Sequence, residues 1–261
     1  MKQFYVKYLI AAMLTGGFLL TSCRSAREAT AHYELSKVEG SMITIDSTWD
    51  ANPDKKAIEV LKPYKDKVDA MMYEVIGTSE MKMDKGKPES LLSNLVASVL
   101  QQAAAQLLGK PADMGLVNMG GLRNILPKGE ITVGEAFEVL PFENSLCILT
   151  MKGSDMKQLF KAIASLNGEG VSGIHLDITK TGKLLNATIG GKPVEDNQLY
   201  TVATIDYLAD GNGRMDAFLQ AEKRECPEGA TLRGLFIDYI RKQTAEGKVI
   251  TSQLDGRITI K

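Results

Sequence analysis

Residues 118–144 read NMGGLRNILPKGEITVGEAFEVLPFEN, and this stretch contains the features from which the fold and a candidate site are inferred. Gly120 and Gly121 permit backbone conformations that are closed to other residues and allow a ligand to approach closely. Arg123 adds a permanent cation with a planar donor group that suits carboxylate or phosphate. A proline fixes the chain directly before Phe142, whose ring offers a flat face to a base. The stretch indicates a site of nucleoside or nucleotide size; a structural turn beside a core phenylalanine is the alternative.

The beginning of the chain has the pattern of a secretory signal. Two lysines precede an apolar run at 9–20, which is too short to span a membrane comfortably. The run ends on Leu-Thr-Ser-Cys, which resembles a bacterial lipoprotein signal with Cys23 as the acylated first residue. We therefore expect a signal peptide at 1–22 and a polar tether at 23–30, with an uncleaved anchor helix as the alternative. Both place the folded part outside the cytoplasm on a membrane, in the periplasm or at the cell surface.

The remaining chain, 31–261, is long enough for one domain with a sizeable core. Its composition, 44% hydrophobic and 24% charged residues over the whole chain, is typical of a globular protein. The 31 basic and 32 acidic residues nearly balance. This balance argues against nucleic acid as a partner held by bulk charge.

Cysteines and histidines are few. With Cys23 committed to lipid, Cys147 and Cys226 remain, and the sequence does not show whether they meet in a disulfide. The apolar neighbours of Cys147 favour a buried thiol. His32 and His175 stand far apart, with no cysteine or carboxylate at ligand spacing. The sequence therefore predicts no metal site in this chain.

The hydrophobic pattern mixes helices and strands without strict βαβ alternation, which favours an α+β fold in layers. Loose alternation predicts one or two strands within 32–46, and 168–173 is expected to be a flexible loop. Apolar residues at helical spacing predict helices at 53–72, 89–108, 153–166 and 230–244. Strands are expected at 73–82, 114–117, 145–151, 175–178, 184–189, 200–205 and 257–260.

The motifs of the stretch resemble those of the C-terminal domain of bacterial and animal 5′-nucleotidases, the half of these enzymes that determines substrate specificity. The family's N-x-G-G-[IL]-R and P-F-[GE]-N motifs are matched at 118–123 and 141–144, and its G-x-I-T turn is matched by K-G-E-I-T at 128–132. The resemblance runs from about Tyr73 to the last residue. It implies a layered α/β/β/α sandwich, with sheets inside and helices outside.

The resemblance also implies which side chains bind a ligand. Asn118 and Arg123 match residues that contact the nucleotide, and Phe142 and Tyr207 match the two rings that stack on the base. Asn144 follows the first ring and would hydrogen-bond the base. Stacking of this kind contributes about 1–3 kcal/mol per ring. The alternatives are a turn for Asn118, an ion pair for Arg123 and two unrelated core aromatic residues.

Several positions depart from the family pattern. Glu143 replaces a common glycine after the first ring. In the second glycine-rich loop the family has G-G-D-G, whose aspartate binds the ribose hydroxyls. This chain has D-G-N-G there, so the carboxylate has either moved to Asp210 or been lost, with Asn212 or Asp216 as substitutes. Where many members carry an arginine before the long helix, this chain offers only lysines.

The resemblance implies the nucleoside- or nucleotide-recognising, substrate-binding half of a split 5′-nucleotidase, which serves nucleotide catabolism outside the cytoplasm. Full-length members hydrolyse with a two-metal site on a separate N-terminal domain, and two scattered histidines do not supply such a ligand cluster. We therefore expect no cofactor in this chain and a separate metallophosphoesterase chain, holding the divalent metals, as its partner. The alternatives are a non-catalytic interaction or scaffold lipoprotein that kept the fold and lost ligand binding, and a hydrolase with an unrecognised site.

Overall fold

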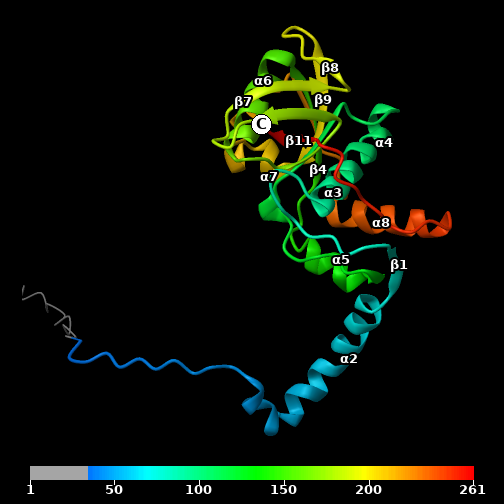
Figure 1. Ribbon diagram of the computed structural model, residues 1–261. Helices are drawn as coiled ribbons and strands as arrows, with labels where there is room; N and C mark the ends of the chain where they lie inside the picture. Colours follow the sequence, from blue (N-terminus) through cyan, green and yellow to red (C-terminus); the bar gives the residue numbers. More distant parts are fainter. Residues whose placement is uncertain (1–34) are drawn as a thin grey trace, which may run out of the picture. The chain divides into compact units, whose positions relative to one another are not determined.

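The computed structural model describes residues 35–261, and the predicted signal peptide, the tether and Cys23 lie outside the described residues (Figure 1). The chain divides into a unit that ends at Asp54 and a compact unit, Lys55–Lys261. In the first unit, the described residues 35–46 are exposed and contain no strand, and a 3₁₀ helix, η1, follows at Ser47–Ala51. The strands predicted within 32–46 are therefore wrong over 35–46, because a strand persists only where a neighbour pairs with its backbone.

The compact unit contains three sheets. The strands are, in chain order, β1 Val75–Ser79, β2 Met114–Val117, β3 Gly129–Thr132, β4 Leu146–Lys152, β5 Gly170–Ser172, β6 Ile174–Ile178, β7 Leu184–Ile189, β8 Lys192–Pro193, β9 Leu199–Ile205, β10 Lys223–Glu225 and β11 Ile258–Ile260. One sheet has the order β10-β4-β9-β2-β5, with β2 and β9 parallel, and a second has the order β11-β6-β7-β8, with β11 and β6 parallel. Strands β1 and β3 form a separate antiparallel pair.

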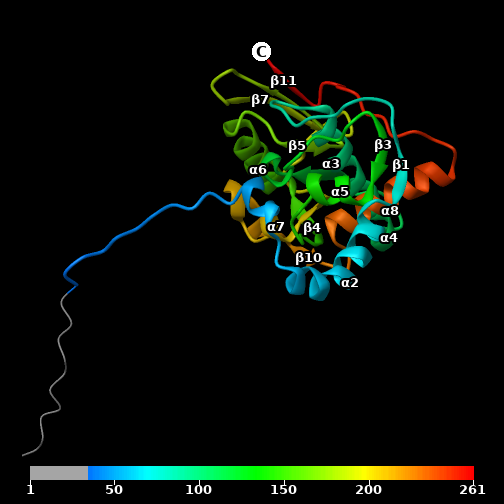
Figure 2. The same cartoon turned by 90° about the horizontal axis from the view of Figure 1, so that it is seen from below.

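The compact unit also contains helices. They are α2 Lys55–Met72, α3 Leu91–Ala103, α4 Ala105–Leu108, α5 Val133–Val139, α6 Gly153–Ser165, α7 Asp206–Ala209 and α8 Leu232–Ala245, with 3₁₀ turns η2 Met119–Gly121, η3 Asn212–Arg214 and η4 Asp216–Gln220. Helix α3 contacts β2, β5 and α8, and α6 contacts strands of both larger sheets (Figure 2). The predicted layered α+β fold is confirmed.

Helix α3 anchors the core. Ser90 caps its first turn and forms a reciprocal capping box with Ser93, which satisfies backbone groups that a helix start leaves unpaired. The helix packs so closely on β2 that a Cβ built at Gly115 would lie 2.2 Å from the carbonyl oxygen of Ala97, so only glycine fits there. The segment Leu91–Leu108 is long and apolar enough to cross a membrane, but half of it is buried in the protein. It is a core helix.

Two further predictions are corrected by the structure. The expected loop at 168–173 contains β5, a fully buried strand that pairs antiparallel with β2. Cys147 is not a free thiol, because it forms a disulfide with Cys226. The register explains this pairing: β10 runs antiparallel to β4 with Glu225 opposite Ile148, so the next residue, Cys226, comes beside Cys147.

Candidate functional site

Three segments with predicted site residues meet at one edge of the five-stranded sheet. Because β2 and β9 are parallel neighbours, the residues that follow them, Asn118 and Tyr207, emerge at the same edge. Strand β4 runs antiparallel to β9 with Leu146 opposite Ile205, so Asn144, just before β4, reaches that edge as well. The sheet topology thus brings together residues that are far apart in the sequence.

These segments enclose a cavity of about 330 Å³, which we call the ring cavity. Its lining residues are Asn118, Gly120, Gly121, Phe142, Asn144 and Tyr207. The two rings are only half-buried: Phe142 is 47% exposed and Tyr207 is 44% exposed. The cavity therefore offers flat apolar faces together with two amide side chains.

The amide of Asn118 lies against the glycine pair. A Cβ built at Gly121 would lie 3.1 Å from its Oδ1, and one at Gly120 would lie 3.3 Å from its Nδ2. Within the described residues, Oδ1 of Asn118 is buried and accepts no hydrogen bond. A buried acceptor without a donor costs about 1–3 kcal/mol.

The loop that carries Asn118 is held through its backbone at two points. The amide of Met119 donates to the carboxylate of Glu169, at 2.5 Å, and Lys85 Nζ donates to the carbonyl oxygen of Leu122, also at 2.5 Å. Glu169 is only 7% exposed, and burial raises the pKa of its carboxyl group although Lys87 lies 3.7 Å away. The two lysines therefore support the loop, and neither lines the ring cavity.

The segment around Phe142 is held by Arg233 in the first turn of α8. Arg233 is 6% exposed and donates to the carbonyl oxygens of Leu140, at 2.9 Å, and of Phe142, at 3.5 Å. Its guanidinium group also lies 3.9 Å from the centroid of the Phe137 ring and is ion-paired with Glu143. Burial lowers the pKa of Arg233 from its usual value. This role of Arg233 is not predictable from the sequence, because nothing local distinguishes it from other polar residues of an amphipathic helix.

Asn144 and Tyr207 are fixed by one carboxylate. Oδ1 of Asp206 accepts from Nδ2 of Asn144, at 3.1 Å, and from the backbone amide of Tyr207, at 2.8 Å. Gly213 has a φ of +67°, and a Cβ there would lie 3.1 Å from Leu208 and 3.8 Å from the Tyr207 ring. Glycine at this position keeps space beside the ring.

Arg123 is not among the lining residues of the ring cavity but lies beside one of them, Phe142. Its guanidinium carbon lies 5.8 Å from the centroid of the Phe142 ring, a cation–π distance, and its Nη1 makes a long contact of 3.4 Å with the carbonyl oxygen of Gly120. The backbone amide of Arg123 donates to the carbonyl oxygen of Val139, which fixes the position of the residue. The exposed guanidinium group therefore offers its charge beside a half-exposed ring.

Asp210 is not brought into the ring cavity. Its carboxylate is ion-paired with Arg224 at 2.6 Å, and neither Asn212 nor Asp216 lines the cavity. The structure therefore assigns no carboxylate to a ribose position.

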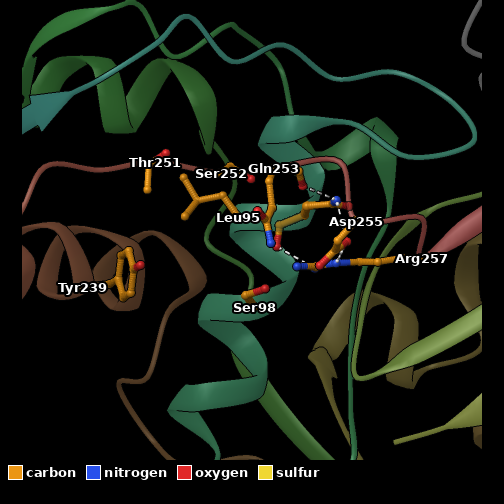
Figure 3. Close-up of a pocket in the computed structure, with 9 residues that line it drawn as sticks. Leu95, Ser98, Tyr239, Thr251, Ser252, Gln253, Asp255 and Arg257 are labelled. Carbon is orange, nitrogen blue, oxygen red and sulfur yellow. Dashed lines mark hydrogen bonds and ion pairs between the residues drawn. The ribbon is translucent and has the colours of Figure 1, made fainter. Parts of the chain in front are cut away.

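A second cavity, of about 380 Å³, lies between α3, α8 and the chain after Ile250 (Figure 3). Arg257 is ion-paired there with Asp255, at 2.8 Å, and donates to the carbonyl oxygens of Asn94, at 2.9 Å, and Val171, at 2.8 Å. The charged groups of this cavity are thus paired with other groups of the protein. They fasten the C-terminal segment to α3.

The described residues, 35–261, contain no group of three or more His, Cys, Asp or Glu side chains that could hold a metal ion. His175 contacts the carbonyl oxygen of Gly256, at 2.6 Å, and the carboxylate of Asp177, at 3.2 Å. His32 lies outside the described residues.

The fold and the ring cavity define an α+β domain with a small-molecule-sized site at the edge of its largest sheet. Residues 75–220 match the family model described as "5′-nucleotidase, C-terminal domain", which is more than half of the chain. The chain belongs to this family.

Individual relatives agree with this assignment. The cell wall protein Lmo0130 of Listeria monocytogenes is 28% identical over 86% of this chain and 32% of its own length. The protein UshA of Yersinia enterocolitica is 27% identical over 70% of this chain and 34% of its own length. The crystal structure of a 5′-nucleotidase precursor from Thermus thermophilus superposes with a TM-score of 0.66 and 27% identity, over 81% of this chain and 44% of that one. The chain thus spans about a third of these two relatives and less than half of the solved one.

Proposed function

We propose that the chain recognises a nucleoside or nucleotide in the ring cavity, as the substrate-binding half of a split 5′-nucleotidase. One observation carries the proposal: Phe142 and Tyr207, both half-exposed, line one cavity together with the amides of Asn118 and Asn144. A nucleobase needs such flat apolar faces and, at its edges, such donors and acceptors.

Each side chain then has a stated role. The base stacks on Phe142 and Tyr207, with a contribution of about 1–3 kcal/mol per ring. The amides of Asn118 and Asn144, which both line the cavity, bond the polar groups of the base. Arg123, beside Phe142, meets a phosphate at the rim, where its planar guanidinium group suits that anion. Asp210 receives no role, because Arg224 already binds its carboxylate.

We propose further that hydrolysis is supplied by a separate metallophosphoesterase chain, which holds the divalent metals. The match to the family model described as the C-terminal domain of 5′-nucleotidases supports a role in binding the substrate. The protein would act outside the cytoplasm, anchored to a membrane through an acylated Cys23. The disulfide Cys147–Cys226 supports that location, since disulfides persist in oxidising compartments, and so does the cell wall relative.

Calorimetric titration with adenosine and AMP tests the binding site. The protein is the chain from Arg24 onward, which keeps every residue that the structure describes. Phe142→Ala should weaken binding of both ligands about 5- to 150-fold, which corresponds to about 1–3 kcal/mol. Arg123→Ala should weaken AMP more than adenosine, because only AMP carries the phosphate.

The matched control is Tyr64→Ala, which removes a ring that is 70% exposed on α2 and does not line the cavity. It should leave both affinities unchanged, and all three variants should keep the unfolding midpoint of the wild type. Unchanged affinities in Phe142→Ala and Arg123→Ala would show that the proposed site is wrong.

The second candidate function is a non-catalytic interaction or scaffold lipoprotein that kept the fold and lost ligand binding. The ion pair between Asp210 and Arg224 favours it, since Asp210 is the carboxylate expected to replace the family's ribose-binding aspartate and is engaged elsewhere. A thermal-shift screen of nucleosides, nucleotides and nucleotide sugars distinguishes the two functions. A shift with any of them supports ligand recognition, and no shift with all of them supports the scaffold.

A further inference from the structure

Helix α2 is amphipathic, yet none of its residues is buried in the described structure. The apolar side chains Leu61, Tyr64, Val68 and Met71 are 50–70% exposed although they recur at helical spacing. In a water-soluble domain such a stripe normally faces the core. The apolar spacing predicted the helix correctly, but its apolar side chains are not buried in the core.

The helix is attached to the rest of the compact unit at one end. Its C-terminal turn meets α5, where a Cβ built at Gly134 would lie 3.1 Å from the carbonyl oxygen of Met72. Figure 1 shows α2 leaving α5 and β1 at this end, and nothing else in the compact unit covers its length. The apolar stripe is therefore open along most of the helix.

The charges of α2 are distributed unequally around its axis. At about 100° per residue, Lys65 and Lys67 each lie about 80° from the centre of the apolar stripe, one on either side. Glu59 and Asp66 lie about 160–180° from that centre, on the opposite side. Asp66 is also paired with Lys62, at 2.8 Å. Lys65 is ion-paired with Asp69, which lies about 120° from that centre on the same side. The apolar stripe is thus bordered by Lys67 on one side and by the Lys65–Asp69 pair on the other, and Glu59 and Asp66 point away from it.

We propose that α2 is a lipid-binding helix that lies flat on an anionic membrane surface. The apolar stripe would enter the boundary between headgroups and acyl chains, while Lys65 and Lys67 would extend to the lipid phosphates. An apolar face with basic borders and a polar far side is the arrangement that such interfacial helices share. A second copy of the chain fits less well, because two such faces would bring lysine borders together.

This proposal goes beyond ligand recognition in the ring cavity and does not require acylation of Cys23. The test uses the non-acylated chain from Arg24 onward, with vesicles of phosphatidylcholine mixed with phosphatidylglycerol and vesicles of phosphatidylcholine alone. Binding is measured by co-flotation and by the emission of Trp49, which is the only tryptophan in the sequence, precedes α2 and is 58% exposed. We expect flotation and a blue shift with the anionic vesicles and much weaker binding to the neutral ones.

Three variants at exposed positions separate the contribution of the apolar stripe to membrane binding from that of the lysines, and a fourth serves as the control. Leu61→Glu should abolish flotation, since it puts a charge in the apolar stripe. Lys67→Gln should weaken binding to anionic vesicles about fivefold, the change that corresponds to about 1 kcal/mol per basic residue at such a surface. Lys65→Gln should weaken it less, because Lys65 is paired with Asp69. Glu59→Gln, on the far side, is the matched control and should not weaken binding.

Equal flotation of the wild type and Leu61→Glu would overturn the proposal, as would the absence of binding to anionic vesicles. Light scattering in the absence of lipid tests whether a second copy of the chain occupies the stripe instead. If the wild type forms a dimer that Leu61→Glu dissociates, the stripe binds a second copy and the lipid proposal falls. A monomeric wild type that binds anionic vesicles supports it.

Discussion

Replacement of Arg233 by methionine tests how the ring cavity is held together. The guanidinium group is almost fully buried, donates to the carbonyl oxygens of Leu140 and Phe142, and lies on the Phe137 ring. Methionine keeps an unbranched side chain in the place of the arginine stem but is shorter and removes the charge and every donor. The substitution thus leaves the carbonyl oxygens without their donor and releases the segment that carries Phe142.

The size of the effect follows from these contacts. A hydrogen bond from a charged group contributes about 1.5–3 kcal/mol, and a desolvated cation–π contact about 1–2 kcal/mol. The ion pair with Glu143 adds less than about 1 kcal/mol, because the Glu143 side chain is 72% exposed. A contact between the methionine sulfur and the Phe137 ring would offset about 0.3–1.5 kcal/mol of this loss of stability. We expect Arg233→Met to lower the free energy of unfolding by about 2–4 kcal/mol.

Urea unfolding and nucleoside titration measure both consequences, with Arg241→Met as the control on the same helix. Arg241 is half-exposed and pairs with Glu74 at 2.7 Å, so its loss should cost less than about 1 kcal/mol. Arg233→Met should also weaken nucleoside binding, whereas Arg241→Met should not. Equal losses of stability in the two variants would refute the role assigned to Arg233.

Two further predictions concern the pH dependence and the disulfide. Burial raises the pKa of Glu169 above its ordinary value of 4.5, so folding favours the protonated form, and the stability from this group is lost as pH rises through the raised pKa. Glu169→Gln should therefore unfold at higher urea concentration than the wild type at neutral pH, and this difference should disappear near pH 4.5. If the stability of the wild type relative to the variant increases as pH rises, this expectation is contradicted. The disulfide joins residues 79 positions apart, so reduction, or Cys147→Ala with Cys226→Ala, should lower the free energy of unfolding by about 4 kcal/mol. Unfolding curves with and without dithiothreitol measure that loss, and two free thiols in the untreated native protein would contradict the pairing.

Several elements were predictable because their cause is local. The apolar spacing of 89–108 predicts a helix, and the structure has α3 and α4 within that range, interrupted at Ala104. Alternation likewise predicted β6, β7 and β9 close to their observed bounds. In these segments the side-chain period is sufficient, since it does not depend on distant parts of the chain.

The candidate site was predicted in part. The motifs singled out Asn118, Phe142, Asn144 and Tyr207, which line one cavity. The residues that hold them were missed: Arg233 binds carbonyl oxygens about 90 positions away, and Glu169 binds an amide 50 positions away. A single side chain that bonds a distant backbone group leaves no periodic pattern in the sequence.

The sequence by itself determined the α+β class, the family motifs and the amphipathic character of α2, because composition and spacing along the chain carry that information. Only the tertiary structure decided that Cys147 meets Cys226, that Arg224 takes the carboxylate of Asp210 and that the apolar stripe of α2 stays outside the core. The physical reason is common to all three. Strand register and helix placement set which distant groups come within a few ångströms, and those short distances decide which charges, thiols and apolar faces find partners.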